Sequence, residues 1–522
     1  MRSFRISCIF TVLLSACFGG QEGSDFGLDT AVGIDPDTDT DTDADTDADT
    51  DADADADTDS DTDTDTDVDT ADTGIDTGGD TALMDTGMVC QDLARSLWIS
   101  PDDSNSMSSA VQSRNAVLGG RSIPDVRPYE FMNYYDFDYP PAIGGGLRLH
   151  GSMVQDPAMA AGDYLFQFAV SSANQSNPYR DPMNVALVMD TSGSMQGAPI
   201  GRARDVCRAI AYSLKAGDTV SMATWNSGNN VVLDGLAVTQ PNEQALVDAC
   251  DEMDANGGTD LHNGLTEGYR MANQYHVAGQ ISRVVLVSDG GANLGVIDED
   301  LIALNAGQGD RAGIYIVGVG TGDGVGYNDA LMDTVTDKGR GAAVFIDSTA
   351  EADLIFRDRF VNTMDVAGRA VQVRIDLPPD FRIVRYTAEE ISGNQQDIEP
   401  QHIAPNDAMV FHQTLRTTEP GCVDMNTQIT VAIDWLHPLT NQPQQMEQTW
   451  TFAELLGDDT SQLRKGHAVY LYTQALQHWK DTPNQPLAVA AVAIALTALD
   501  QADLAYPADP ELAEIRSVLN AL

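Results

Sequence analysis

Positive charge is scarce in this sequence. The 522 residues include 80 Asp and Glu but only 28 Lys and Arg, which gives a formal net charge of −52. Surfaces that bind nucleic acid or anionic lipid headgroups need clustered Lys and Arg. The composition therefore excludes nucleic acid as a partner and argues against direct binding to an anionic membrane surface. It is compatible with divalent cations.

Several catalytic motifs are also missing. The sequence has no H-E-x-x-H zinc motif and no G-x-S-x-G nucleophile motif. It has no C-x-x-C pair, so a cysteine zinc site is not expected. The apolar fraction of 42% is enough for a buried core, and the length predicts two to four domains.

Cysteine is rare but informative. Apart from Cys8 and Cys17 near the N-terminus, an even number of cysteines remains, which permits two disulfides in an exported protein. Two of them fall in predicted helices of one domain and the other two flank that domain. We therefore expect the pairs Cys207–Cys250 and Cys90–Cys422; buried free thiols are the alternative.

The N-terminus has the pattern of an export signal. Arg2 and Arg5 precede an apolar run from Ile6 to Leu14. The following L-S-A-C sequence ends at Cys17 and resembles a bacterial lipobox. We expect a signal peptide over 1–16 and a lipid on Cys17, with an ordinary signal peptide as the alternative. No other stretch looks long enough to span a bilayer, because Leu487–Leu499 has only 13 apolar-rich residues.

Low complexity follows the signal. From Asp35 to Asp69 every second residue is Asp. Such a run buries little and repels itself, so 17–89 is predicted to be a disordered tether that lifts a domain off a membrane. A specific calcium loop is disfavoured, since such loops need a glycine turn and this run has no Gly.

Residues 183–365 alternate between apolar strands and amphipathic helices. This alternation predicts an α/β domain with a mostly parallel sheet and helices on both faces. Ligands of such sheets bind at the carboxyl ends of the strands. The predicted strands are Val185–Met189, Val220–Trp225, Val284–Val287, Ile314–Val319 and Ala342–Ile346.

Polar residues gather at the expected strand ends. Asp190, Ser192 and Ser194 follow the first strand, Thr259 lies in a Gly-rich loop, and Asp289 follows the Val284 strand. Singly, such residues can cap helices or turns. Together they form an oxygen-only ligand set, which suits a hard cation such as Mg²⁺.

This pattern resembles the von Willebrand factor A domain family. Residues 190–194 read D-T-S-G-S and are similar to the family's D-x-S-G-S motif, while Thr259 and Asp289 match its second and third loops. The resemblance implies a metal-ion-dependent adhesion site holding Mg²⁺, Mn²⁺ or Ca²⁺. It implies that the hydroxyls bind the metal directly and that the two carboxylates act through water. A Glu or Asp of a partner protein would complete the coordination.

A second resemblance rests on segments before and inside this domain. They are Val126–Pro140 before it, and Gly326–Met332, Asp337–Gly339 and Phe345–Ser348 inside it. These segments are similar to the bacterial YfbK-like lipoprotein family. The resemblance covers about 92–455 and implies an N-terminal segment, an A domain and a C-terminal extension. We expect a partly β region over 90–182, a β-rich domain over 366–455 and, beyond the resemblance, a helical segment over 456–522. The aromatic cluster Phe131–Tyr139 is interpreted as core packing rather than as a ligand platform.

Alternation in the flanks predicts antiparallel strands. With Leu147–Leu149 and Tyr164–Val170 they would form a β-sandwich beside the A domain. Three helices are expected over 462–480, 485–505 and 510–521, with the Ala-rich stretch Leu487–Leu499 as the buried one. The predicted strands after the A domain are Val371–Ile375, Phe381–Tyr386, Gln428–Ile433 and Gln448–Phe452.

Three functions are compatible with this organisation. The favoured one is a non-enzymatic binding module on a lipid-anchored protein of the bacterial cell envelope. A metal-dependent hydrolase is the second, but His262 is interpreted as structural or exposed rather than as a base. A structural envelope protein with an incidental metal site is the third. Phe18 after the lipid-bearing Cys favours the outer membrane, by analogy with other lipoproteins.

Overall fold

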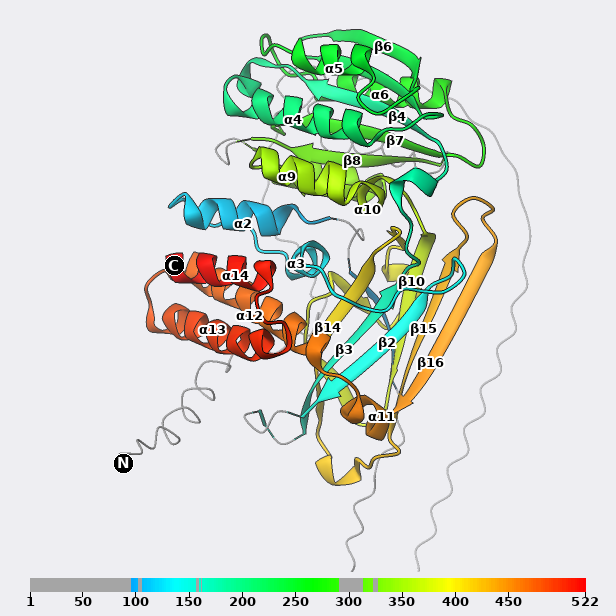
Figure 1. The fold of residues 1–522 in the computed structure, drawn as a ribbon. Coiled ribbons are helices and arrows are strands. Elements are labelled where there is room, and N and C mark those ends of the chain that lie inside the picture. The colour runs from blue at the N-terminus through cyan, green and yellow to red at the C-terminus, as the bar shows by residue number, and fades with distance from the viewer. Residues whose placement is uncertain (1–94, 102–105, 156–158, 161, 291–312, 323–326) are drawn as a thin grey trace, which may run out of the picture. The chain divides into compact units, whose positions relative to one another are not determined.

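The structure is a computed structural model that describes residues 95–101, 106–155, 159–160, 162–290, 313–322 and 327–522 (Figure 1). All of these residues belong to one compact unit. The expected signal peptide, the lipidation site Cys17, the acidic tether and Cys90 lie outside the described residues.

The A domain is built on one sheet with the strand order β6-β5-β4-β7-β8-β9. All neighbouring pairs are parallel except β5 and β6, which are antiparallel. The α/β fold with a mostly parallel sheet is therefore confirmed. The strands are β4 (Met183–Asp190), β5 (Thr219–Trp225), β6 (Asn229–Ala237), β7 (Ile281–Ser288), β8 (Ile314–Gly320) and β9 (Ala342–Phe345).

Helices cover both faces of this sheet, as Figure 1 shows. Successive side chains of a strand point to opposite faces. Leu187 of β4 packs in the core shared with α4 and α9, whereas Val188 packs in the core shared with α6 and α8. The helices are α4 (Ala198–Ser213), α5 (Gln244–Asp251), α6 (Leu261–Gln274), α8 (Asp329–Lys338), α9 (Thr349–Asp353), η3 (Leu354–Asp358) and α10 (Phe360–Met364).

The flanking strands form a β-sandwich, which confirms that expectation. One sheet has the order β12-β1-β10-β15-β16, with β13 also paired to β10, and the other has the order β11-β14-β3-β2. Their inner faces enclose a separate apolar core. The strands are β1 (Arg95–Ser100), β2 (Arg148–Val154), β3 (Asp163–Ser171), β10 (Gly368–Leu377), β11 (Phe381–Tyr386), β12 (Glu390–Ser392), β13 (Gln401–Ile403), β14 (Ala408–Thr417), β15 (Gln428–Leu436) and β16 (Pro443–Thr451).

The A domain is inserted into this sandwich. The chain enters it from β3 to β4 and leaves it from α10 to β10, so strands from both flanks share the same two sheets. Sequence separation hides this arrangement, because the pairing of β3 with β14 joins residues more than 230 positions apart, such as Phe168 and Phe411.

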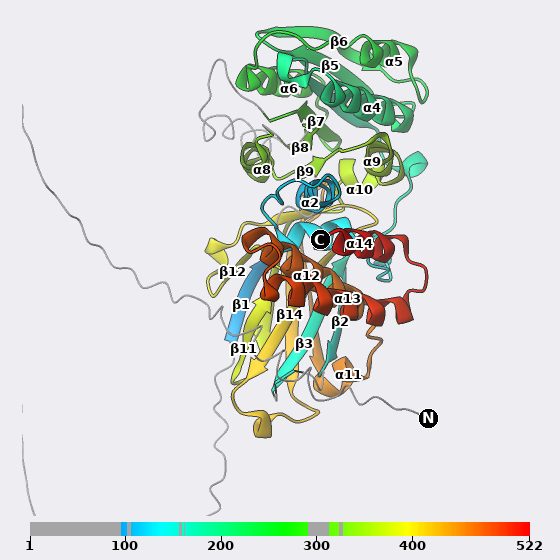
Figure 2. The same cartoon turned by 90° about the vertical axis from the view of Figure 1, so that its left-hand side faces the viewer.

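Helices of both flanks pack together beside the sandwich, as Figure 2 shows. They are α2 (Ser108–Leu118), α3 (Pro128–Tyr134), α12 (Ser461–Asp481), α13 (Pro486–Ala505) and α14 (Pro510–Ala521), and the short α11 (Phe452–Gly457) follows β16. Phe131, Tyr134 and Tyr135 are buried in this layer, so the core-packing interpretation of the aromatic cluster is confirmed.

The expectation that the stretch Leu487–Leu499 is the buried helix is wrong. Helix α13 buries only Ala488, Ala495, Leu499 and Ala502, whereas α12 is the buried helix of the three. An apolar helix is buried only where neighbours contact it, and α13 contacts α12 and α14 on one side. Val489 on its other side is 51% exposed.

The helix predicted over 485–505 is confirmed, but the expectation that no stretch after the N-terminus is long enough to span a bilayer is wrong. The helix over Pro486–Ala505 has 20 residues and a mean hydropathy of 1.6, so by length and composition it is long enough to cross a membrane. Only 22% of that window is buried inside the structure. Its C-terminal part carries Asp500 and Asp503, which form ion pairs with Arg516 of α14.

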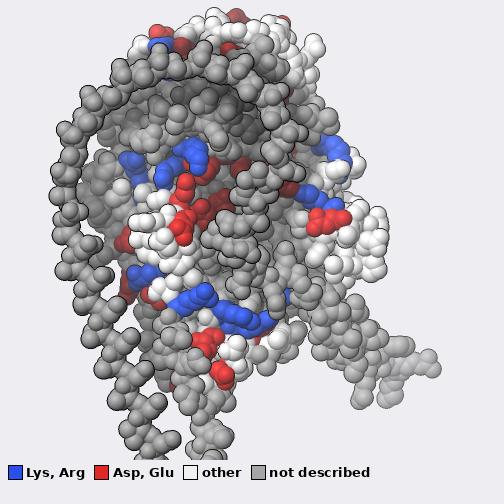
Figure 3. Space-filling view, turned by 180° about the vertical axis from the view of Figure 1, so that it is seen from behind, with Lys and Arg blue, Asp and Glu red and all other residues white. Residues whose placement is uncertain are grey.

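Much of the scarce positive charge is used in ion pairs. Arg114 of α2 contacts Asp347 and Glu351 of the A domain at 3.1 and 2.8 Å, and Glu514 of α14 at 2.9 Å. On the face drawn in Figure 3, Lys and Arg side chains occur in small groups beside Asp and Glu. Ion pairs such as those of Arg114 thus connect helices of the flanks with the A domain.

Candidate metal centre

Asp190 is the last residue of the central strand β4 and is fully buried. Its Oδ1 accepts a hydrogen bond from the backbone N–H of Ser192 at 2.8 Å, and its Oδ2 accepts one from the hydroxyl of Ser288 at 2.7 Å. Burial raises the pKa of Asp190 to about 6, the two hydrogen bonds oppose that rise, and the charge of Asp289 adds to it. The carboxylate is therefore held in one orientation at the sheet edge.

Ser192 and Ser194 lie in the loop that follows β4. The turn η2 (Gly193–Met195) brings their hydroxyl oxygens to 3.0 Å from each other. Ser192 is fully buried, while Ser194 is exposed. The first two hydroxyls of the predicted set thus lie side by side next to Asp190.

The second loop is attached to the first through the backbone. The N–H of Gly193 donates to the carbonyl of Gly257 at 3.0 Å, and the N–H of Asn256 donates to the carbonyl of Thr191 at 2.7 Å. A Cβ at Gly193 would lie 3.0 Å from that carbonyl, so glycine permits this close approach.

Thr259 comes two residues after Gly257 and is 1% exposed. Asp260 does not join the site. Its side chain accepts from the backbone N–H of Asn263 at 3.1 Å and caps α6. His262 lies in the first turn of α6 and is half-buried.

Asp289 follows β7, the neighbour of β4, and is 7% exposed. It lies next to Ser288, whose hydroxyl also accepts from the N–H of Gly290 at 3.0 Å. Gly290 has a positive φ of 79°, and a Cβ there would lie 2.7 Å from the backbone nitrogen of Asn328. This glycine allows the third loop to turn tightly at the sheet edge.

Ser288 was not among the residues predicted for the site. It orients Asp190 across the two strands, and its only signal in the sequence is its place directly before Asp289. Within the described ranges, no group of three or more His, Cys, Asp or Glu is arranged to hold a metal. The predicted metal site is not such a group, because three of its five residues are Ser or Thr.

A disulfide joins α4 and α5 in the same domain. Cys207 and Cys250, one of the two expected pairs, are bonded with their Cα atoms 5.7 Å apart. The other pair, Cys90–Cys422, includes a residue outside the described part of the chain and stays a prediction.

The sheet order and the three loops at its edge define the class of the protein. Residues 185–292 match the family model of the von Willebrand factor type A domain. The chain therefore contains a domain of this class, which points to protein interaction and is often associated with a divalent metal.

In sequence the chain is similar to YfbK and to other curated proteins. It is 24% identical to YfbK of Escherichia coli (strain K12) over 281 residues, which are 51% of this chain and 48% of YfbK. It is 26% identical to inter-alpha-trypsin inhibitor heavy chain H3 of Mesocricetus auratus over 33% of this chain and 20% of that protein. The matches thus span about half or less of these relatives.

Among solved structures, a von Willebrand factor type A protein from Catenulispora acidiphila matches 68% of this chain and 87% of its own. That match has 14% sequence identity and a TM-score of 0.43.

Proposed function

We propose that the site at the ends of β4 and β7 binds a divalent cation, Mg²⁺ in the first place, and presents it to an acidic side chain of a partner protein. The direct ligands would be the hydroxyls of Ser192, Ser194 and Thr259. Asp190 and Asp289 would hold metal-bound waters. Mn²⁺ and Ca²⁺ are the other ions that the site could accept.

The observation that carries this proposal is the 3.0 Å separation of the Ser192 and Ser194 oxygens. Octahedral Mg²⁺ binds its ligands at about 2.0–2.1 Å, so two adjacent ligands at a right angle lie about 3 Å apart. The two hydroxyls therefore have the spacing of adjacent ligands of one ion.

The charges of the proposed metal-binding residues favour an additional ligand from a partner protein. Both oxygens of Asp190 already accept hydrogen bonds from Ser192 and Ser288, which suits a carboxylate that acts through water. Neutral hydroxyls do not cancel the charge of a divalent cation. An anionic group such as a Glu or Asp of the partner would complete both coordination and charge.

The location belongs to the same proposal. A lipid on Cys17 would anchor the chain to the bacterial cell envelope, at the outer membrane, with the acidic segment as a spacer. The variant Cys17→Ser should move the protein from the membrane to the soluble fraction. Retention of this variant on membranes through high-salt washing would contradict the lipid anchor.

Metal binding can be tested on the purified chain by calorimetry and thermal melting, with and without Mg²⁺. The wild type should gain stability with Mg²⁺, by about 2.7 kcal/mol at a hundredfold excess over the dissociation constant. Asp190→Ala should fold and lose this gain. The exposed Asp254→Ala, near the second loop, is the matched control and should keep it.

Partner binding is tested by capture from envelope extract on immobilised protein, followed by mass spectrometry. A specific partner should bind the wild type in Mg²⁺, and should be lost with EDTA or with Asp190→Ala.

Two outcomes would contradict the proposal. An equal gain of stability with Mg²⁺ in the wild type and in Asp190→Ala would mean that the ion binds elsewhere. Esterase or phosphatase turnover that Asp190→Ala abolishes would favour a hydrolase instead.

A further inference from the structure

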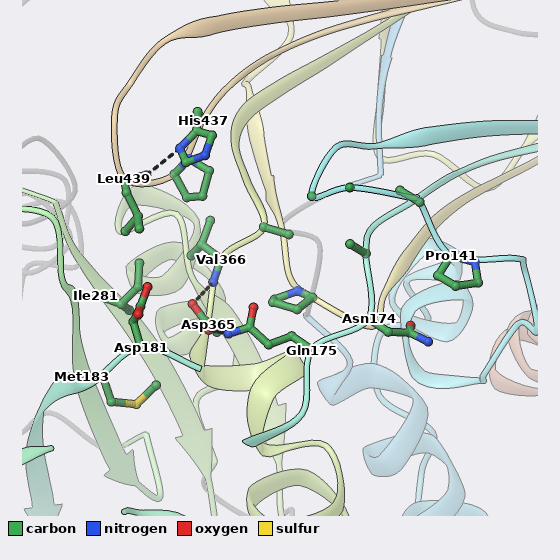
Figure 4. Close-up of a pocket in the computed structure, with 17 residues that line it drawn as sticks. Pro141, Asn174, Gln175, Asp181, Met183, Ile281, Asp365, Val366, His437 and Leu439 are labelled. Carbon is green, nitrogen blue, oxygen red and sulfur yellow. Dashed lines mark hydrogen bonds between the residues drawn. The ribbon is translucent and has the colours of Figure 1, made fainter. Parts of the chain in front are cut away.

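A cavity lies where the chain crosses between the sandwich and the A domain. Figure 4 shows it at the ends of β4 and β7 that carry Met183 and Ile281, so it is at the opposite edge of the sheet from Asp190 and Asp289. Its volume is about 460 Å³. Cavities of about 300–1,000 Å³ are typical of small-ligand sites.

Several hydrogen bonds fix the walls of this cavity. The backbone N–H and carbonyl of Gln175 both bond to the side chain of Asn406, at 2.7 and 2.8 Å. Arg283 donates to the carbonyls of Met364 at 3.0 Å and Asp365 at 3.2 Å. These bonds fix the backbone at two lining residues, Gln175 and Asp365, so this part of the wall is in place without a ligand.

The titratable side chains that line the cavity are two carboxylates and the imidazole of His437. Asp181 and Asp365 line the cavity, and none of the described lining residues is Lys or Arg. Asp365 is 9% exposed. Its Oδ1 accepts from the backbone N–H of Val366 at 2.8 Å, while its Oδ2 accepts one long bond of 3.3 Å from the amide of Gln175. A carboxylate oxygen can accept two donors, so Oδ2 has capacity for another.

The environment of Asp365 is unfavourable for a lone anion. Burial raises its pKa, and the hydrogen bond from Val366 and the charges of Arg283 and Arg180 offset that only in part. Neither arginine lines the cavity. A cation that entered the cavity would stabilise the ionised carboxylate from the open side.

Apolar side chains form part of the remaining wall, beside the polar Asn174 and Gln175. Ile281, Val366 and Leu439 line the cavity together with three prolines, Pro141, Pro405 and Pro438. In the sequence, Ile143 lies between two lining residues and is 93% exposed, and Tyr179 lies between Gln175 and Asp181 and is 88% exposed. The lining thus combines carboxylates with apolar side chains.

We propose that this cavity binds an alkyl ammonium group, whose nitrogen contacts Asp365 and whose unbranched carbon chain lies along Ile281, Val366 and Leu439. A free aliphatic amine and a lysine side chain share this chemistry. The inference does not depend on the metal site, which lies at the other sheet edge.

The test uses the full chain without its lipid and three five-carbon probes: 1,5-diaminopentane, neutral 1-pentanol and anionic pentanoate. Calorimetry or ligand-observed NMR should show binding of the diamine and none of the other two. A short acetylated Gly-Lys-Gly amide then distinguishes a lysine side chain from a free amine. Binding of either cationic probe supports the proposal.

Two variants locate the binding. Asp365→Asn removes the charge with little change in shape. It should lower the affinity for the diamine at least about tenfold, the loss expected for a charge-assisted hydrogen bond. Ala173→Leu should also lower the affinity for the diamine, because Ala173 lines the cavity and a larger side chain there would fill it. Asp434→Asn, an exposed carboxylate of β15 outside the cavity, is the control and should leave binding unchanged.

Two outcomes would overturn the proposal. One is the absence of any cationic-probe binding to the wild type. The other is equal affinity of the wild type and a folded Asp365→Asn, with folding checked by thermal melting.

Discussion

Ser288 donates a 2.7 Å hydrogen bond to Asp190 and so joins the ends of the adjacent strands β7 and β4. This contact lies within the buried edge of the A-domain sheet. It fixes the orientation of a carboxylate that the proposed metal site needs, without placing Ser288 among the proposed ligands. Ser288 is therefore a positioning residue.

We predict that Ser288→Ala weakens Mg²⁺ binding by roughly tenfold. This is the size of effect seen when a residue that orients a metal-binding group through a hydrogen bond is removed. The matched control is Ser282→Ala on the same strand, because Ser282 is also buried and hydrogen-bonded but lies at the opposite end of β7. Both variants should lose about 1–3 kcal/mol of stability, since each leaves a buried polar partner unsatisfied. Mg²⁺ titration by calorimetry should separate them. Equal metal affinities for the two variants would show that Ser288 has no positioning role.

The A domain was largely predictable from the sequence because its elements are local. The apolar run ending at Asp190 and the run ending before Asp289 each form a strand from consecutive residues. By contrast, β6 was not predicted. Polar residues such as Asn229 and Asp234 leave only the short apolar run Val231–Leu233 in this edge strand, which is shorter than the runs by which the other strands were identified.

What the sequence could not show depends on contacts between distant segments. Strand β14 pairs with β3 across the inserted A domain, and no local pattern carries that information. The exposure of α13 depends on which neighbours reach it rather than on its own composition. Likewise, the role of Ser288 depends on the register between β4 and β7, which places it beside Asp190.

The buried ion pairs of Arg114 predict a large effect on stability. Arg114→Met removes the cation that lies between Glu351, Asp347 and Glu514. Burial already raises the pKa of Glu351, so the loss of Arg114 leaves buried carboxylates without their partner. We expect a cost of about 3–5 kcal/mol in the free energy of unfolding, measured by urea denaturation.

Arg208→Met is the control for this prediction. Arg208 pairs with Asp251 at 2.6 Å, but both side chains are about half exposed. An exposed pair contributes at most about 1 kcal/mol. If the two variants were destabilised equally, the ion pairs of Arg114 would contribute no more to stability than an exposed pair. They would then not be what holds α2 and α14 on the A domain.

The Cys207–Cys250 bond closes a loop with a sequence separation of 43 residues. A double Cys207→Ala, Cys250→Ala variant should lose about 2–4 kcal/mol of stability, because the unfolded chain regains freedom that the cross-link removes. Thermal melting of the oxidised wild type, the reduced wild type and the variant measures this effect. Melting of the oxidised wild type at the same temperature as the variant would contradict it.

The last prediction concerns a pair of histidines where α12 packs on the sandwich, the buried His412 and the half-buried His467. His412 Nδ1 lies 3.0 Å from Oε1 of Gln167, and its Nε2 lies 3.2 Å from Nδ1 of His467. The amide nitrogen of Gln167 donates to the carbonyl of Gln462 at 3.0 Å, which sets the orientation of the amide because a carbonyl only accepts. Nδ1 of His412 therefore donates to the amide oxygen of Gln167.

Burial and the neighbouring His467 hold the pKa of His412 well below its ordinary value of about 6.5. The unfolded state then binds a proton that the folded state excludes. The stability from this group is complete above about pH 6.5 and falls as the pH is lowered, by up to about 1.4 kcal/mol per pH unit. Glu130 and Asp407 act in the opposite direction, because burial raises the pKa of each to about 7 and stability is lost as the pH rises toward 7.

A comparison of variants isolates the contribution of the histidine. His412→Gln keeps a donor and an acceptor but does not titrate, so its stability should fall less steeply than that of the wild type between pH 6.5 and 5. His478→Gln, at the other end of α12, leaves the pair of histidines in place and should keep the wild-type slope. Urea denaturation at several pH values measures the three slopes. Parallel curves for the wild type and His412→Gln would show that protonation of His412 does not limit stability in acid.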